Sequence, residues 1–343
     1  MSYIIDGKQI AASWREKLKE DIQSIREFTN ANRPPCLAIV QANKNSASDV
    51  YIRNKVRACK TAGIKTRVIH MNENCHQADL LYLIHKLNTD DSVDAIMVQS
   101  PMYEWINESA IFDAIAPHKD ADGFNSKNAG MLLENPTNYS LTCLKPCTPY
   151  GIVKMLHSVP VQIAGKHCVI IGRSKIVGRP LAMMLLNENA TVTVCHSKTE
   201  NLKEICKTAD ILIVAIGKAK YITSDYVKSN AVVIDVGMNT DKNGKLCGDV
   251  DFEDVSKIAS AITPVPGGVG PMTVAALLSN TIECWYQHVQ HINKDDKFNN
   301  YTVSSGYTEL LLHYIAPPIS GQMQIDTNEF GNFIGYSECA KGE

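Results

Sequence analysis

The sequence predicts an α/β protein of two domains. Short continuous apolar runs alternate with stretches of helix-like apolar spacing along most of the chain. Strands that alternate with helices in this way form parallel sheets covered on both faces. The length of 343 residues corresponds to about two domains at roughly 150 residues each.

The composition excludes several classes of protein. Lys and Arg number 34 against 36 Asp and Glu, which gives a net charge of −2. This balance offers no basic surface for nucleic acid or anionic lipid. With 45% hydrophobic and 20% charged residues, the chain matches an ordinary globular protein, and no apolar run reaches membrane-spanning length. We therefore expect no nucleic-acid partner and no membrane partner.

The eleven cysteines are odd in number and lie mostly within apolar runs. Disulfide frameworks belong to short secreted chains, so we expect reduced thiols and a cytoplasmic location. Cys143 and Cys147 are close together, but no second pair completes a zinc set, and we expect no metal.

In the first part of the chain, each element has its own signal. Apolar spacing with interleaved charges predicts helices, and continuous β-branched runs predict buried strands. Gly63 ends the second helix, and residues 117–149 are predicted to be rich in loops. The expected helices are 11–28, 51–62 and 79–87, and the expected strands are 37–40, 68–69 and 95–98.

The second part has the regular strand–helix alternation of a Rossmann-type array. A Pro/Gly-rich loop at 264–271 and a long helix at 272–290 follow it. Residues 292–343 form an extension with an apolar patch at Leu310–Leu312, and we expect it to pack along the protein surface without chemistry of its own. The expected strands are 169–171, 192–194, 211–214 and 232–234, and the helices are 180–186 and 202–207.

The segment from Gly172 to Gly178 joins a strand to a helix that begins near Pro180. Such a junction aims backbone N–H groups and the positive helix end at an anion. The spacing departs from G-x-G-x-x-G, so an ordinary turn remains the alternative. The next strand does not end in the carboxylate that NAD enzymes commonly use to bind the ribose 2′-hydroxyl. Arg173 of the glycine loop, with Ser197 and Lys198 after this strand, could instead bind a 2′-phosphate. The sequence therefore favours NADP over NAD.

Other candidate residues lie in the first part. Tyr51 and Lys55 are four residues apart, on one helix face. Gln99 follows a strand, at the sheet edge where α/β proteins bind ligands. Asp122 lies in a glycine-containing loop. Taken singly, Tyr51 and Lys55 could belong to a solvated helix face, and Asp122 could be a turn-forming Asp.

Together, these segments resemble the bifunctional methylenetetrahydrofolate dehydrogenase/cyclohydrolase family. The likeness runs from Ile4 to about His291. It rests on eight segments: Tyr51–Lys55, Val98–Pro101, Asp120–Phe124, Pro146–Pro149, Gly172–Gly178, Cys195–Thr199, Val233–Gly237 and Pro264–Thr273.

The resemblance implies a folate-binding catalytic domain at 1–147, with helix 272–291 packed back on it, and a Rossmann-type NADP-binding domain at 148–271. It implies oxidation of 5,10-methylenetetrahydrofolate to the methenyl form with NADP, then hydrolysis to 10-formyltetrahydrofolate. Such an enzyme serves one-carbon metabolism and purine biosynthesis, and family members are typically homodimers through the nucleotide domain. The pair His196-Ser197 argues against the NAD-linked branch that uses magnesium and phosphate.

Carried over residue by residue, the resemblance assigns site roles. Lys55 matches the catalytic lysine, Gln99 the glutamine that contacts it, and Asp122 the aspartate at the pterin end; Tyr51 lines the same pocket. The expected cofactor residues are Gly172, Arg173, Ser174, His196, Ser197 and Met238. The expected substrate residues are Tyr51, Lys55, Val98, Gln99, Ser100, Asp122, Pro266, Gly267, Gly268, Val269 and Gly270.

Two places depart from the pattern: Ser100 replaces the leucine that commonly follows the glutamine, and Gln41-Ala42 follows the strand near Val40 where Val-Gly is usual. Three alternatives remain at this point. A dehydrogenase without hydrolase activity would not need both Lys55 and Gln99. A non-catalytic folate- or nucleotide-binding regulator could use the same fold. An amino-acid dehydrogenase would leave Pro264–Thr273 unexplained.

Overall fold

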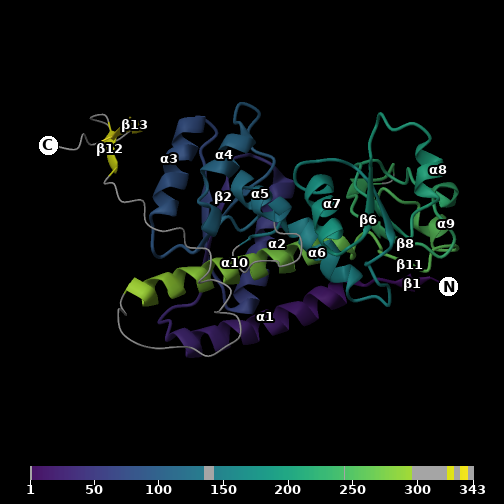
Figure 1. Ribbon diagram of the computed structural model, residues 1–343, viewed down its shortest axis with the longest axis horizontal. Coiled ribbons are helices and arrows are strands. Elements are labelled where there is room, and N and C mark those ends of the chain that lie inside the picture. Colours follow the sequence, from purple (N-terminus) through teal and green to yellow (C-terminus); the bar gives the residue numbers. More distant parts are fainter. Residues whose placement is uncertain (1, 135–142, 243, 296–322, 328–332, 339–343) are drawn as a thin grey trace. The chain divides into compact units, whose positions relative to one another are not determined.

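The computed structural model describes residues 2–134, 143–242, 244–295, 323–327 and 333–338 (Figure 1). The chain divides into two compact units, 1–296 and 297–343. In the second unit, β12 (Met323–Thr327) and β13 (Phe333–Glu338) pair antiparallel. The patch Leu310–Leu312 lies outside the described residues, so the packing of the extension stays a prediction.

The first lobe contains a three-stranded parallel sheet in the order β3-β2-β4. Strands β2 and β4 are buried on both faces, as continuous apolar runs predict, whereas the edge strand β3 is largely exposed. In β2, Leu37 and Ile39 belong to one core cluster, and Ala38 and Val40 to another. The strands are β2 (Cys36–Gln41), β3 (Lys65–His70) and β4 (Ala95–Gln99), and the helices beside them are α2 (Ser46–Ala62), α3 (Gln77–Asn88) and α4 (Glu108–Ala114).

The second lobe contains a six-stranded parallel sheet in the order β1-β11-β8-β7-β5-β6. Its strands are β1 (Tyr3–Ile4), β5 (His167–Ile171), β6 (Thr191–Cys195), β7 (Ile211–Val214), β8 (Val232–Asp235) and β11 (Ala261–Ile262). The other elements here are α7 (Gly178–Asn187), α8 (Leu202–Cys206), α9 (Phe252–Val255), η2 (Ser224–Tyr226) and the pair β9 (Asn239–Thr240) and β10 (Leu246–Cys247).

Strand β1 departs from the expected domain boundary. We assigned residues 1–147 to the first domain, but Tyr3 and Ile4 pair in parallel with Ala261 and Ile262 at the edge of the second sheet. A two-residue strand carries too little pattern to reveal its partner.

The prediction of a loop-rich stretch at 117–149 is partly wrong. It contains the turn η1 (Pro117–Lys119), helix α5 (Ser126–Glu134) and the start of α6 (Cys147–Leu156). Pro149 does not break α6, because the first helical turn has no intrahelical partner for its N–H groups. Helix α5 spans nine residues, too few for a clear periodic signal.

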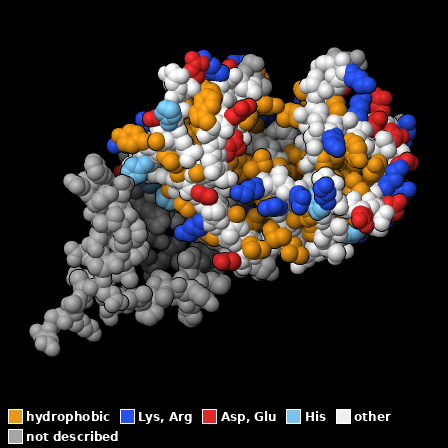
Figure 2. All heavy atoms as spheres, turned by 90° about the horizontal axis from the view of Figure 1, so that it is seen from above, with side chains coloured by type: hydrophobic (Ala, Val, Ile, Leu, Met, Phe, Trp, Pro, Cys, Tyr) orange, Lys and Arg blue, Asp and Glu red, His pale blue; other side chains and the backbone are white. Residues whose placement is uncertain are grey.

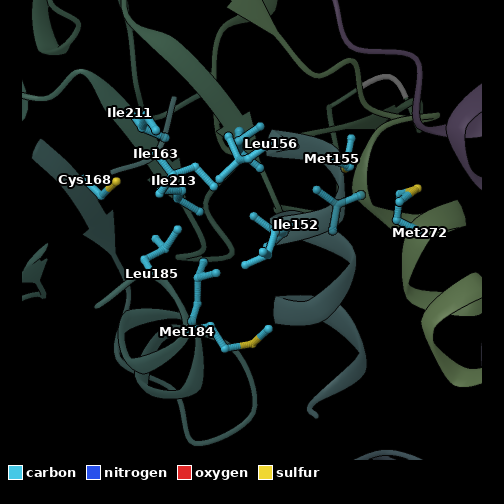
Figure 3. Packing of buried hydrophobic residues seen from close by; sticks show 14 of the residues in the cluster. Ile152, Met155, Leu156, Ile163, Cys168, Met184, Leu185, Ile211, Ile213 and Met272 are labelled. Carbon is cyan, nitrogen blue, oxygen red and sulfur yellow. The ribbon is translucent and has the colours of Figure 1, made fainter. Parts of the chain in front are cut away.

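Apolar side chains from several elements form the core of the second lobe. Figure 3 shows Ile152 and Leu156 of α6 directed toward Leu185 of α7 and Ile213 of β7. All four are fully buried. Helix α6 therefore packs on the sheet that carries the glycine loop.

Two long helices, α1 (Gly7–Thr29) and α10 (Val269–Asp295), pack side by side (Figure 1). Helix α10 begins three residues before the predicted start, so Val269 and Gly270 belong to its first turn. Its Met272 is buried in the second lobe's core, and its Trp285 in the core that contains Leu37. None of the described helices is long and apolar enough to cross a membrane.

A buried ion network also holds α10 against the first lobe. The Asp94 carboxylate accepts hydrogen bonds from Arg33 at 2.6 and 2.8 Å and from the backbone N–H of Cys36 at 2.8 Å. Its Oδ1 lies 2.7 Å from His288 Nδ1 on α10. These partners hold the pKa of Asp94 below its usual range against the opposing effect of burial.

Trp285→Ala tests the contribution of α10 to stability. Trp285 is 0% exposed, so truncation leaves a cavity and should lower the free energy of unfolding by about 3–5 kcal/mol. Phe28→Ala is the control, because Phe28 is 68% exposed and should cost under about 1 kcal/mol. Chemical denaturation measures both variants, and equal losses would contradict this account of the core.

Candidate active site

Helix α2 presents Tyr51 and Lys55 one turn apart, at the carboxyl end of the first sheet. The half-buried Lys55 Nζ donates to Gln99 Oε1 over 3.0 Å and lies 3.6 Å from Met97 Sδ. Gln99 is the last residue of β4 and is 8% exposed. The structure thus brings together the two residues that spacing alone leaves unconnected.

The Gln99 amide has partners at both ends. Its Nε2 donates to the Ser100 carbonyl over 2.6 Å, while its Oε1 accepts from Lys55. The Ser100 hydroxyl lies 3.0 Å from both carboxylate oxygens of Glu108, at the start of α4. Glu108 also accepts the Met102 N–H at 2.7 Å. Sequence reasoning missed Glu108, although the N-cap Asn107 was a usable signal for a helix start.

The half-buried Asp122 lies close enough to Lys55 for the two side chains to interact electrostatically. Burial raises the pKa of Asp122 to about 6, the nearby Asp120 adds to the rise, and Lys55 opposes it. The loop is fixed from α10, because Asn280 Nδ2 donates to the carbonyls of Ala121 and Lys145, each over 2.8 Å. The charged form of Asp122 is therefore held at a cost in stability.

The glycine loop after β5 has the geometry of an anion cradle. Gly172 has φ +129°, and a Cβ there would lie 2.3 Å from the Ala215 carbonyl. A Cβ on Gly178 would lie 2.1 Å from the Gly172 carbonyl. Ser174 Oγ accepts from the N–H of Val177 at 3.1 Å. Both glycines are thus required for the tight entry into α7.

The neighbouring strand ends offer further polar groups. His196 Nδ1 accepts from the Lys198 N–H at 3.1 Å, while Ser197 and Lys198 are exposed, as is Arg173 in the glycine loop. After β7, the Asp249 carboxylate accepts from the N–H groups of residues 216, 217 and 218 at 2.7–3.1 Å. Asp249 fixes the wall beside Gly172, a role that its sequence context did not signal.

Two contacts join the lobes across the site. Tyr51 OH donates to Met238 Sδ over 3.2 Å, and Lys175 Nζ donates to Ser109 Oγ over 3.2 Å. Tyr51 and Met238 are 42% and 52% exposed, so a ligand between the lobes can reach both. Figure 2 shows a notch flanked by hydrophobic side chains on one face, with charges of both signs around it.

The expected substrate loop divides into two parts. Pro266 and Gly270 are exposed and Gly267 is half-buried. Gly268 and Val269 are buried, and a Cβ on Gly7 would lie 1.9 Å from the Gly268 carbonyl. The loop therefore rests on the N-terminus of α1.

The side chain of Val98 points away from the lysine–glutamine pair, and the expectation that Val98 binds substrate stays a prediction. Side chains alternate along β4, so Gln99 faces α2 while Val98, 1% exposed, packs in the opposite cluster. Cys143 and Cys147 contact different partners: the Cys143 thiol donates to the Asn128 carbonyl, and the Cys147 thiol donates to the Ala121 carbonyl. Across the described residues, no group of three or more His, Cys, Asp or Glu side chains could hold a metal.

This fold, with a lysine–glutamine pair in one lobe and a glycine cradle in the other, is that of a two-domain dinucleotide-dependent enzyme. Family models match residues 5–122, described as the tetrahydrofolate dehydrogenase/cyclohydrolase catalytic domain, and residues 146–289, described as its NAD(P)-binding domain. The chain belongs to the tetrahydrofolate dehydrogenase/cyclohydrolase family.

Similar proteins agree with this assignment. The bifunctional protein FolD of Agathobacter rectalis is 48% identical over 82% of this chain and 99% of its own length. The crystal structure of bifunctional FolD from Campylobacter jejuni is 44% identical, with a TM-score of 0.79, and covers 85% of this chain and 100% of its own. The Trypanosoma brucei enzyme, solved with NADP cofactor and an inhibitor, is 34% identical, with a TM-score of 0.79 over 84% and 99%.

Asp122→Asn tests the strain at the site. Since the pKa of folded Asp122 is about 6, the folded state binds its proton more tightly than the unfolded state does. Stability is therefore lost as the pH rises from about 4 to about 6. The variant should be more stable than the parent by about 1–3 kcal/mol at pH 7 and nearly equal at pH 4.

Denaturation at both pH values measures this difference. Asp91→Asn is the control, because Asp91 is exposed and its removal should change stability little at either pH. A gain for Asp122→Asn that is the same at pH 4 and pH 7 would contradict the burial argument.

Proposed function

We propose that both activities of the family, methylenetetrahydrofolate dehydrogenase and methenyltetrahydrofolate cyclohydrolase, share one site in this chain, with NADP as the hydride acceptor. The observation that carries this proposal is the 3.0 Å contact between Lys55 Nζ and Gln99 Oε1. It supports the hydrolytic step in particular, because a lysine held by a neutral partner can take part in proton transfer. The bifunctional relatives support the same pair of activities.

The residues of the glycine loop fit a dinucleotide. The cradle between Gly172 and Gly178 has no room for a Cβ, and the start of α7 offers backbone N–H groups to a phosphate. Arg173, Ser197 and Lys198 are exposed at the ends of β5 and β6, where they can contact a 2′-phosphate. When bound, NADP supplies the acceptor for a hydride from the one-carbon bridge.

In the first reaction, the chain's own residues bind and orient the substrate. A folate lying between the lobes can place its flat rings against Tyr51, which is exposed there. The Asp122 carboxylate can accept N–H groups from the amino-pyrimidine edge of the pterin through charge-assisted hydrogen bonds. No protein nucleophile is needed, because positioning accounts for the contribution of these residues.

In the second reaction, water adds to the methenyl carbon and the ring opens. In its neutral form, Lys55 accepts the proton that the attacking water loses. The resulting ammonium can then return that proton to the ring nitrogen as its bond to carbon breaks, so the lysine ends as it began. The hydroxyl of the adduct loses its remaining proton to solvent as the formyl C=O forms. Gln99 orients Lys55 throughout without adding charge.

We further infer a homodimer formed through the nucleotide-binding lobe and a cytoplasmic location, as the resemblance implies. Strand β6 supports the first point, because it is an edge strand whose Val194 is 37% exposed, and open edges favour association. The free thiols of the ten described cysteines are consistent with a reducing compartment.

Lys55→Met tests the hydrolytic role. The variant keeps a chain of similar length but has no amine, so hydrolysis of methenyltetrahydrofolate should fall by at least about 100-fold. Absorbance of the methenyl compound follows the reaction directly. Lys60→Met, an exposed position on the same helix, is the control, and hydrolysis by Lys55→Met at the parent rate would refute the assignment.

Ser197→Asp tests the cofactor preference. A carboxylate at this exposed position would repel a 2′-phosphate, so NADP affinity should fall by about tenfold or more while NAD affinity changes less. Ser229→Asp adds the same charge at another exposed site of this lobe and should leave the ratio unchanged. Titration with each cofactor measures both constants, and an unaltered preference would rule out this contact.

A further inference from the structure

The segment from Ser100 to Met102 lies directly behind the lysine–glutamine pair. It contributes a single group to that pair, the Ser100 carbonyl, which accepts Gln99 Nε2 at 2.6 Å. This contact decides which end of the Gln99 amide faces Lys55. If the amide were reversed, its NH₂ group would face the lysine and its oxygen would face another acceptor, so both hydrogen bonds would be lost.

The segment itself is held from two sides. Glu108 contacts the Ser100 hydroxyl through both carboxylate oxygens at 3.0 Å and accepts the Met102 N–H at 2.7 Å. From the strand β2 side, Asn43 Nδ2 donates to the Pro101 carbonyl, and the Tyr103 N–H donates to the Ala42 carbonyl over 2.8 Å. Of these three residues that hold the segment, Glu108 is the one that contacts Ser100, whose carbonyl accepts from Gln99.

Within the part of the chain that the structure describes, Glu108 makes no hydrogen bond or ion pair with Lys55 or Gln99, so its influence on the lysine passes through Ser100. Its place at the start of α4, next to the N-cap Asn107, anchors the carboxylate to a helix rather than to the loop it holds. The adjacent Ser109 accepts from Lys175 of the glycine loop at 3.2 Å. The start of α4 thus contacts both the segment behind the lysine–glutamine pair and the opposite lobe.

We propose that Glu108 is a positioning residue for the hydrolytic reaction: by holding Ser100, it fixes the Gln99 amide with its oxygen toward Lys55. The proposal rests on the proposed function of Lys55. It also predicts selectivity, because hydride transfer needs the substrate and cofactor aligned but no proton transfer by Lys55. Loss of Glu108 should therefore impair hydrolysis more than dehydrogenation.

Glu108→Ala and Glu108→Gln form the first test. The alanine variant should lower the kcat of hydrolysis by about tenfold or more, with KM and the dehydrogenase rate within about threefold of the parent. Glutamine keeps an oxygen that can accept from Ser100 and Met102, so it should recover most of the loss. Glu104→Ala, an exposed glutamate in the same loop, is the matched control.

A double-mutant cycle with Gln99→Ala is the second test. If Glu108 acts through Gln99, removing Glu108 from the Gln99→Ala protein should change hydrolysis by less than about twofold. Ser100→Ala removes only the hydroxyl contact and should lower hydrolysis in the same direction, which keeps the test open if Glu108→Ala fails to fold.

The outcomes separate the two proposals. Unchanged hydrolysis in Glu108→Ala, equal loss of both activities without rescue by glutamine, or full additivity with Gln99→Ala would each overturn the positioning role. Any of these results, together with a hydrolytic defect in Lys55→Met, would leave the proposed function intact. Parent-like hydrolysis by Lys55→Met would instead overturn the proposed function and, with it, this inference.

Discussion

The structure depends on one helix that is buried in two cores. Helix α10 begins among the side chains of the second lobe, where Met272 is buried, and continues into the first, where Trp285 is buried. Between them, Asn280 binds the carbonyls of Ala121 and Lys145, one on either side of the Asp122 loop. The same rigid element therefore joins the lobes and positions the acidic group of the site.

At the site, the burial of a charged side chain lowers the stability of the fold. Asp122 is kept where burial raises its pKa to about 6, although a neutral side chain would fit there at lower cost. Lys55, by contrast, donates to the uncharged Gln99, an amide that orients the amine without adding a charge of its own.

Much of the fold and part of the site could be predicted from local pattern. Apolar runs located β2, β4, β5, β7 and β8 because each is buried on both faces. The four-residue spacing of Tyr51 and Lys55 placed them together on α2. Short elements, however, were not predicted, because α5 and the two-residue β1 contain too few residues to show a periodic pattern.

By itself, the sequence determined the alternation of strands and helices, the glycine loop and the residue types of the site, because these depend on local periodicity and backbone freedom. The tertiary structure alone decided that β1 joins the second sheet, that Tyr51 meets Met238, and that Glu108 contacts Ser100, whose carbonyl accepts from Gln99. The Tyr51–Met238 contact joins residues 187 positions apart. Such contacts arise only when the helices and sheets pack, and no local pattern encodes them.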